Sequence, residues 1–374
     1  MAALTLTMHR DFNHNQLLAQ LVVDREQVTL DSLETETNAG FKSLMFSVKL
    51  SNAAKDLWLD DASPWWMCDL RLTAGSFLVF EGQLAEIVEA DDGVSCTAVG
   101  YWNALFDDYT SEIHNRITLS ILYYGYTVQA VWLYVVNYLI LPAGRLQVGD
   151  IPGPSSAFST IPMTEPAKFG DYLIQALDLS VEDRNILYHW YYYVWDNRKV
   201  YTAEFAPSSP PAWRVRRKPG TRIERRLTLD GYATTSYVDY GPSRVLSDEH
   251  TDLVEQRRLG YQRVNYRRES TLISGAVANI LAKKELQTRS SPARLGNITV
   301  QGDMEDMAGV SWPGYHVRAG QSIRVLEWTL PRTVQRDLVI FHTVFDFKSN
   351  QLTLTVNDAP ARLSLSKGGV IYST

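Results

Sequence analysis

The chain has few of the features by which several common protein classes are recognised. Its 374 residues include only two cysteines, Cys68 and Cys96. This number and spacing provide neither a disulfide framework nor a metal-ligand motif, so we expect two buried free thiols and synthesis in a reducing cytoplasm. The longest apolar run, residues 128–141, is interrupted by polar side chains and is too short to cross a bilayer. The N-terminus shows no basic start followed by an apolar core, so no secretory signal is predicted.

Motifs with a known chemical mechanism are also missing. There is no phosphate-cradling loop, zinc-protease helix or nucleophile elbow. Residues 303–306 hold three carboxylates but lack the glycine and ligand pattern of a calcium loop, which favours an exposed acidic turn. His189 has no second ligand type at a useful spacing and is interpreted as a packed or surface imidazole. We therefore predict no enzyme activity, catalytic residue, metal or cofactor, although a carboxylate pair across a cleft is also compatible with the sequence.

The composition is that of an ordinary folded protein with many aromatic side chains. Hydrophobic residues make up 45% and charged residues 21% of the chain, and the length favours two or three domains. The 20 tyrosines and 10 tryptophans are of ring types enriched at protein interfaces. Residues 1–110 carry 6 basic and 17 acidic side chains (net −11), and residues 206–300 carry 17 and 9 (net +8). Such polarity steers partners, repels a polyanion, or reflects two solvated faces.

Alternating side-chain character predicts strands through the first 108 residues. The Asp91-Asp92-Gly93 sequence between two alternating runs favours a tight hairpin. Strands are expected at residues 20–24, 40–48, 77–88 and 94–100. Together they predict a meander of strands that closes or curls.

Residues 109–205 differ in character, because apolar positions recur there at helical spacing before a second run of strands. Helices are predicted at residues 113–122, 129–140 and 168–177. Two strands are then expected within residues 187–205, separated by a turn at Asp196-Asn197-Arg198.

The C-terminal part again favours strands. Residues 221–229 alternate as one strand, and a helix is expected over residues 271–286 with Ser270 as its cap. The run from Tyr315 to Leu363 is interpreted as a small closed sheet, with a turn between Asp346 and Gln351. Its strands are expected at residues 322–328, 338–347 and 351–356.

Two basic clusters follow a proline-rich boundary at residues 207–211. The first lies within residues 214–226 and includes Arg216 and Arg217, and the second, within residues 257–268, includes Arg257 and Arg258. Such clusters can track nucleic-acid phosphates. Because one of them overlaps an alternating strand, a solvent-exposed face or pairing with the acidic first domain of a neighbouring subunit is the favoured interpretation.

Two aromatic groups are candidates for contacts between proteins. Trp65 and Trp66 stand next to Pro64, and a band at residues 188–195 includes Trp190 and Tyr192. In a strand, one row of the band faces a core and the other faces a neighbour. Core or interface packing is favoured for both groups over a ligand-stacking platform, since no sugar- or base-binding context surrounds them.

The succession of several short motifs resembles the hub, or tail-tip minor, proteins of tailed bacteriophages, and in layout the central baseplate hub of contractile tails. The resemblance covers nearly the whole chain, and injection systems and gene-transfer particles share this layout. The residues that carry it are Gly40-Phe41, residues 80–84 leading to residues 98–101, residues 194–198 after the helix from Phe169, residues 259–261, the helix near residues 276–281, residues 317–320, and the last strand pair with residues 357–360.

This resemblance implies a mainly β fold with α+β parts. It implies a first tube-type β-barrel domain at residues 1–108, an α/β accessory domain at 109–205, and a second tube-type barrel at 206–374 with an inserted helix at 270–286. Three copies would present six similar barrels and adapt a hexameric tube to a three-fold tip. Arg318, at the approach to the last strands, is expected to serve subunit contacts together with the aromatic and basic candidates named above.

The implied function is that of a structural hub of a phage tail tip or baseplate in the virion. The implied partners are two further copies, tail-tube or distal-tail rings, tape-measure protein and tip, spike or receptor-binding proteins. DNA would pass through the lumen without sequence-specific binding, and no stable membrane insertion is expected. The alternatives are a glycan-binding module and a cell-wall-degrading tail-tip enzyme.

Overall fold

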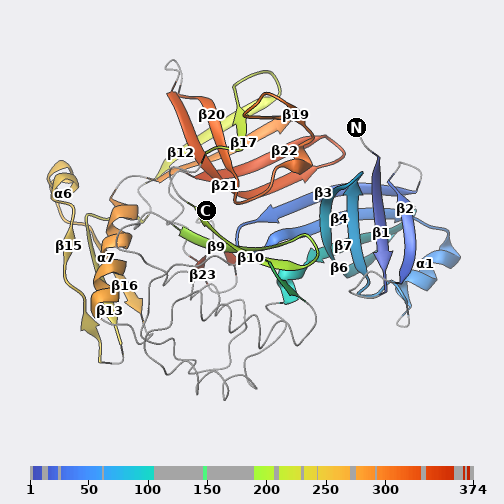
Figure 1. Ribbon diagram of the computed structural model, residues 1–374, viewed down its shortest axis with the longest axis horizontal. Coiled ribbons are helices and arrows are strands. Elements are labelled where there is room, and N and C mark those ends of the chain that lie inside the picture. Colours follow the sequence, from blue (N-terminus) through green and yellow to red (C-terminus); the bar gives the residue numbers. More distant parts are fainter. Residues whose placement is uncertain are drawn as a thin grey trace.

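The protein is mainly β, as the sequence predicts (Figure 1). The structure is a computed structural model that describes residues 3–10, 16–23, 27–60, 63–104, 146–149, 189–205, 210–228, 231–241, 243–269, 275–290, 293–329, 334–357, 365–366 and 369–370. Within these ranges no helix has the length and apolar character needed to cross a membrane. The helices predicted at 113–122, 129–140 and 168–177 lie outside the described residues.

The N-terminal part forms a curled antiparallel sheet in the order β2-β1-β5-β6-β7-β4-β3. Its alternating side chains bury one face, as in β7, where Val94, Cys96 and Ala98 point into the core. The elements are β1 (Leu4–His9), β2 (Leu17–Val22), β3 (Val28–Glu36), β4 (Gly40–Lys49), β5 (Asp69–Ala74), β6 (Phe77–Ala90), β7 (Gly93–Gly100) and η1 (Tyr101–Asn103). The predicted Asp91-Asp92 hairpin is confirmed, since Ala90 pairs with Gly93.

A short helix that the sequence did not predict, α1 (Asn52–Leu59), lies against the β6–β7 hairpin. Trp58 on its inner side is buried in the core. The buried Lys55 donates from Nζ to the carbonyl oxygens of Ala90 and Asp91, which fastens the helix to the hairpin turn. Eight residues give little periodicity, so tertiary contacts rather than the local pattern hold this helix.

The predicted pair of strands around residue 197 is confirmed. β9 (His189–Trp195) and β10 (Lys199–Phe205) form a hairpin, and β8 (Gln147–Val148) pairs with β10. The hairpin meets the N-terminal sheet where Val194 pairs with Gly40. Gly40 has φ +89°, and a Cβ there would lie 2.4 Å from the carbonyl oxygen of Val194, so only glycine permits this close approach.

The C-terminal sheet contains the three strands predicted in the last part of the chain. Neighbouring strands run in the order β12-β17-β22-β21-β20-β11-β18-β19, and β12 and β19 are its edges among the described strands. The sheet is therefore curled rather than closed over the described residues. The elements are β11 (Trp213–Val215), β12 (Thr221–Thr228), β17 (Ala293–Gln301), β18 (Met304–Asp306), β19 (Ser311–Trp312), η4 (Gly314–His316), β20 (Ser322–Thr329), β21 (Val334–Asp346) and β22 (Gln351–Asn357).

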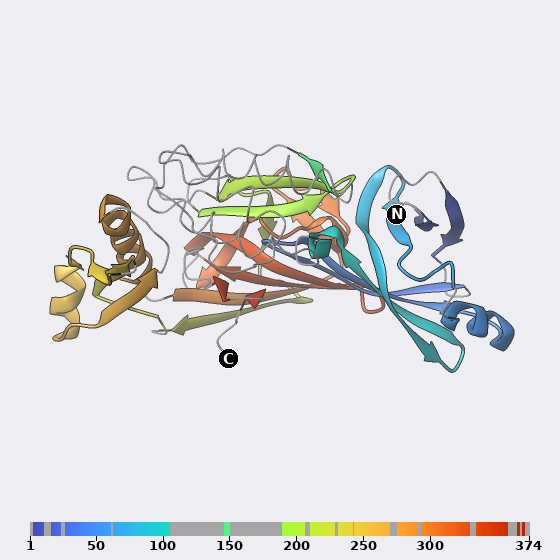
Figure 2. The same ribbon diagram turned by 90° about the horizontal axis from the view of Figure 1, so that it is seen from below.

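The long strand β21 joins the two curled sheets into one. Along one edge it pairs with β22 from Val339 to Asp346, whereas along the other edge its first part pairs with β20 and its last part with β3. The register shifts between Ile340 and His342, so Phe341 forms a bulge where the neighbour changes. Figures 1 and 2 show β3 leading from the N-terminal sheet to the C-terminal one.

A small α/β unit is inserted between β12 and β17 and is larger than the single helix predicted there. In it β13 pairs in parallel with β16 and antiparallel with β14 and β15, and α7 packs on β13. The elements are β13 (Thr235–Tyr240), β14 (Val245–Leu246), β15 (His250–Thr251), α6 (Leu253–Leu259), β16 (Val264–Glu269) and α7 (Gly275–Arg289), and a separate hairpin is formed by β23 (Leu365–Ser366) and β24 (Gly369–Val370). Figure 2 shows this unit at the opposite end of the molecule from α1.

Candidate functional site

The two neighbouring tryptophans of the first sheet have different surroundings. Trp65 stacks on Trp58, with ring centroids 4.8 Å apart and planes 16° from parallel. Trp66 is 54% exposed, and Met67 beside it is also exposed. Since Trp65 is held against the core, the pair does not form a two-ring platform, and Trp66 is the ring available to a partner.

The aromatic band of β9 faces the junction between the sheets. Tyr192 is completely buried, and its backbone N–H donates to Oδ1 of Asn38. The rings of Tyr193 and Tyr201 stack across the hairpin at 5.2 Å. Trp190 lies on β9 with backbone pairing to Glu204. The described part of the band therefore packs within the chain, and its role between subunits stays a prediction.

Arg318 is the side chain at which the two sheets and the β9–β10 hairpin meet. Its side chain is only 17% exposed and donates from Nη2 to the carbonyl oxygen of Leu78 at 2.7 Å. Its guanidinium lies over the rings of Phe41, Phe77 and Trp195, with distances to the ring centroids between 4.6 and 5.2 Å.

The charge of Arg318 is compensated mainly by rings and one carbonyl oxygen. Among the described carboxylates, only that of Asp196 forms an ion pair with Arg318, at 3.8 Å from Nη1. Burial lowers the pKa of the Arg318 guanidinium, which the charge of Asp196 partly opposes. A planar guanidinium can stack and donate at the same time, which a lysine cannot do. Arg318 thus positions three parts of the chain relative to one another.

A second polar group fixes the turn between β9 and β10. Asp196, Asn197 and Arg198 all have positive φ, a costly conformation for residues other than glycine. The buried Glu81 accepts a hydrogen bond from the backbone N–H of Arg198, and Arg71 donates to Oδ1 of Asn197. Burial raises the pKa of the Glu81 carboxyl, an effect that the nearby Arg71 partly offsets. These contacts with the first sheet hold the strained turn in place.

Thr35 makes a third link between the sheets. Its Oγ1 lies 2.7 Å from Oγ1 of Thr343, directly across the β3–β21 pair. The same oxygen accepts a hydrogen bond from the backbone N–H of Ala319, the residue after Arg318. All these groups are buried, so the link is shielded from water.

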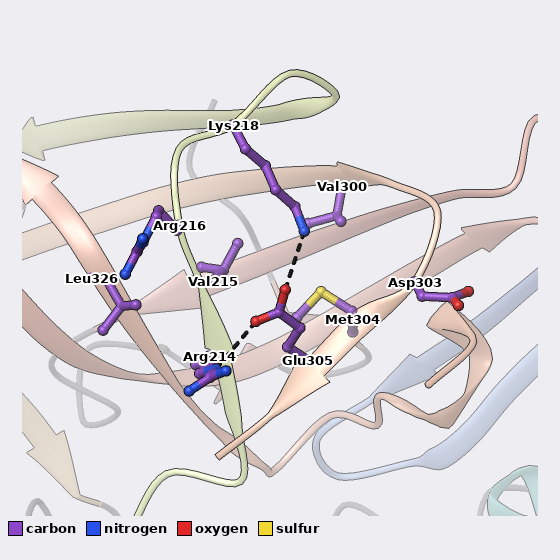
Figure 3. A pocket seen from close by; sticks show the side chains of 9 residues that line it. All are labelled: Arg214, Val215, Arg216, Lys218, Val300, Asp303, Met304, Glu305 and Leu326. Atoms are coloured by element: carbon purple, nitrogen blue, oxygen red, sulfur yellow. Dashed lines mark hydrogen bonds and ion pairs between the residues drawn. The ribbon is translucent and has the colours of Figure 1, made fainter. Parts of the chain in front are cut away.

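The first basic cluster lines a surface cavity of about 290 Å³ on the C-terminal sheet (Figure 3). The burial of β11 alternates, so Trp213 and Val215 point inward while Arg214 and Arg216 point outward. The Glu305 carboxylate lies between Nε of Arg214, at 3.2 Å, and Nζ of Lys218, at 3.5 Å. The cavity is lined by Arg214, Val215, Arg216, Lys218, Val300, Asp303, Met304, Glu305 and Leu326.

Two further arginines of this cluster, Arg216 and Arg217, make other contacts. Arg216 approaches Glu327 at 3.9 Å and its side chain is largely exposed. Arg217 donates to the backbone carbonyl oxygens of Glu327 and Ile223. The cluster is therefore partly neutralised by acids of its own chain, which weakens the case for a phosphate-binding surface.

The second basic cluster belongs to the small α/β unit. Arg257 and Arg258 lie in the last turn of α6, where cations are favourable for the helix dipole. Arg258 donates to Glu255, while Arg257 has no ion-pair partner among the residues the structure describes. On the neighbouring sheet, hydrogen bonding by Tyr266, with further donors from Arg268 and Arg244, lowers the pKa of Asp239 to about 2.

The predicted candidates thus lie in four separate places and do not form one site. Trp65 and Trp66 lie beside α1, Tyr192 and Arg318 at the junction, Arg216 and Arg217 near the cavity, and Arg257 and Arg258 on α6. Sequence reasoning missed Thr35 and Glu81, which carry much of the junction. A charged residue directly after the apolar run of residues 77–80 was the one available signal for Glu81. Among the described residues no three histidine, cysteine, aspartate or glutamate side chains are grouped to hold a metal.

Comparison with family models and with curated protein sequences finds no match. Solved structures of similar shape are found, and they match nearly end to end. A tail protein from Neisseria meningitidis is 11% identical, with a TM-score of 0.61 over 95% of this chain and 96% of its own. The 43 kDa tail protein of prophage MuSo2 from Shewanella oneidensis is 12% identical, with a TM-score of 0.63 over 96% and 98%.

A third structure agrees with these two. The prophage tail protein gp18 from Listeria monocytogenes is 12% identical, with a TM-score of 0.56 over 95% of this chain and 94% of its own. At such low identity the likeness concerns the backbone, and it extends over both curled sheets and the inserted unit. The chain therefore has the mainly β fold of these tail proteins, two of which come from prophages.

Proposed function

We propose that this protein is a structural hub of a phage tail tip or baseplate. The observation that carries the proposal is the end-to-end agreement in fold with three tail proteins, two of them from prophages. A match to one sheet alone would fit many β proteins, because one fold serves many functions. A match that includes both sheets and the inserted unit is far more restrictive.

Three copies form a ring in which the two curled sheets of each chain occupy six similar places. Such a ring adapts a hexameric tail tube to a three-fold tip, as closed cyclic symmetry requires. The proposal assigns residues 1–108 to the first barrel, 109–205 to an accessory domain and 206–374 to the second barrel. The hairpin of β9 and β10 supports a tighter association of the accessory segment with the first barrel, through Gly40 and Val194.

The junction around Arg318 and Thr35 supports a structural role in which the two sheets of each copy keep a fixed relative orientation. A ring that passes tape-measure protein and then DNA needs its two sheets to keep a fixed angle within each copy. Buried hydrogen bonds between β3 and β21 and the stacked guanidinium supply this rigidity. The proposed neighbours are tail-tube or distal-tail rings on one side and tip, spike or receptor-binding proteins on the other.

Two measurements test the proposal: the mass of the purified assembly and the position of the protein in tail particles. Native mass spectrometry of purified protein should give three copies, and images of assembled tails should show a three-fold ring at the distal end of the tube. A stable monomer, or density for this chain outside the tail tip, would contradict it. A peptidoglycan-release assay with the purified protein should remain at background, because the proposed role is structural.

A further inference from the structure

One end of the N-terminal sheet carries an excess of acidic side chains, which we call the acidic tip and define as Asp56, Glu89, Asp91 and Asp92. Asp91 and Asp92 form the exposed turn between β6 and β7, and Asp56 lies on the outer face of α1. Glu89 pairs with Lys55 at 3.5 Å. No ion pair among the described residues involves the other three carboxylates, so their charges remain open to a partner.

Apolar side chains surround the acidic tip. Leu57 and Leu59 on α1 are 67% and 41% exposed, and Val88 on β6 is 50% exposed. Three large apolar side chains on one short helix and its supporting hairpin, next to uncompensated charge, are typical of a contact surface rather than of a solvated end.

The C-terminal sheet carries a surface of the opposite kind, the cavity of Figure 3, which we call the basic pocket. Arg214 and Lys218 share the carboxylate of Glu305, and the one ion pair of Arg216 within the described ranges is a 3.9 Å approach to Glu327. In Figure 3 the three cationic side chains come from one short segment, β11 and the residues after it. Their N–H groups have the capacity to bind further carboxylates.

The basic pocket also has an apolar rim. The hairpin of β18 and β19 begins at its edge with Met304 and Glu305, and Met307, Val310 and Trp312 of this hairpin are exposed. Trp312 is fixed by a hydrogen bond from its Nε1 to Asp306. A ring held in one orientation loses little entropy on binding, which suits an interface.

The acidic tip and the basic pocket cannot meet within one chain. The β6–β7 hairpin lies beyond β4 and β3 from the shared strand β21, whereas β11 lies beyond β20 on its other side. In Figures 1 and 2, α1 is at the far end of the N-terminal sheet, away from the C-terminal sheet.

We propose that the acidic tip of one copy docks on the basic pocket of a second copy. The two surfaces match in charge and each has an apolar rim, which is the composition of a specific interface. Because they are different surfaces of the same chain, the contact is heterologous and repeats around a rotation axis until a ring closes. The inference rests on the proposed ring of identical copies and names the surfaces that join them.

The composition of the pocket favours a protein carboxylate over nucleic-acid phosphate. Asp303 and Glu305 lie among the cations, and they would repel a phosphate backbone that bears one charge at every nucleotide. The separate carboxylates of Asp91 and Asp92 can instead each lie beside a cation of the pocket. The exposed Trp312 and Val310 require an apolar counterpart, which the exposed leucines of α1 provide.

The test reverses the charges of each surface and then of both. One variant carries Asp91→Lys and Asp92→Lys, which the turn accommodates because neither residue has positive φ. A second variant carries Arg216→Glu and Lys218→Glu, two side chains that are 65% and 47% exposed. Light scattering coupled to size-exclusion chromatography, over a series of protein concentrations, gives the concentration at half-assembly.

Each reversal alone should raise the concentration at half-assembly by at least about tenfold, because two attractive contacts become repulsive. The chain with all four changes should return to within about threefold of the wild type, since tip and pocket are again complementary. The matched control reverses two cations that belong to neither surface and are not among the predicted candidates, Arg263→Glu and Lys348→Glu, and should leave assembly unchanged. Circular dichroism and melting temperature verify folding. If a charge-reversed variant fails to fold, the same aspartates are changed to asparagine, and the same arginine or lysine residues to glutamine.

The outcomes separate this inference from the proposed function. The proposed interface is wrong if the wild type assembles but the charge reversals have no effect. It is also wrong if the chain with all four changes assembles no better than the two variants with two changes each. Either result leaves the proposed ring of identical copies unaffected. If the control loses assembly to the same degree, the charges act without specificity and the inference is also wrong. If the wild type stays monomeric at every concentration and in particles, both proposals fail.

Discussion

The strongest prediction from the structure concerns Arg318, which can be changed to methionine with most of its apolar stem retained. Arg318→Met removes the hydrogen bond to the Leu78 carbonyl oxygen and the contact of the guanidinium with three rings. The hydrogen bond to a charged donor contributes about 1.5–3 kcal/mol, and the ring contacts together about 1–2 kcal/mol. Relief of the buried charge, visible in the lowered pKa of Arg318, returns part of this sum.

We therefore expect Arg318→Met to lower the free energy of unfolding by about 2 kcal/mol. Since Arg318 connects the two sheets and the β9–β10 hairpin, its loss should also make their unfolding less cooperative. Urea unfolding followed by tryptophan fluorescence and by far-ultraviolet circular dichroism should give coincident transitions in the wild type and separated transitions in the variant.

The matched control is Arg324→Met, which removes an arginine that pairs with Asp337 on the solvent side of β20. Exposed ion pairs contribute little, so a markedly smaller loss is expected from it. The proposed role of Arg318 at the junction is wrong if the free energy of unfolding of Arg318→Met lies within about 0.5 kcal/mol of the wild-type value with coincident transitions, or if the control loses as much stability.

Three further predictions concern burial and backbone geometry. Burial raises the pKa of Glu81, so the folded protein holds a proton that the unfolded chain releases, and stability falls as the pH rises above 4.5. Glu81→Gln should therefore reduce the fall in melting temperature up to pH 7. Parallel plots of melting temperature against pH for the variant and the wild type would contradict this. Gly40→Ala should lower the melting temperature far more than Gly302→Ala, because both glycines have positive φ but only Gly40 faces a backbone oxygen. Burial also raises the pKa of Cys68 and of Cys96 to about 12. Neither thiol should therefore react with a disulfide reagent until the protein unfolds. Rapid reaction of either thiol in the folded protein would show that it is not buried.

The sequence predicted those elements whose signal is local. The Asp91-Asp92 hairpin and the turn at residues 196–198 depend on neighbouring residues and side-chain alternation, and both are confirmed. The parallel pairing of β13 with β16 was missed because it joins residues about 30 positions apart and leaves no periodic pattern. Helix α1 was missed because contacts of Lys55 and Trp58 with the hairpin and core hold it.

The candidate interface was harder to predict than the strands. Arginine density correctly indicated charged surfaces, but the sequence could not show that Glu305 lies between Arg214 and Lys218, 87 or more residues away along the chain. Arg318 was singled out for contacts between subunits, and the structure places its side chain among residues of its own chain. Whether it also serves the assembly is a prediction that the particle images test.

The pairing of β3 with β21 has a consequence for how the protein is made. Thr35 and its partner Thr343 are 308 positions apart, so the ribosome completes the first sheet long before the neighbour of β3 exists. At roughly 5–20 residues per second the wait is about 15–60 s. During this time the edge of β3 is open to other nascent chains, and the carboxylates of Glu34 and Glu36 at that edge would discourage them from pairing with it. Synthesis of β21 then closes the edge and completes the connection between the sheets.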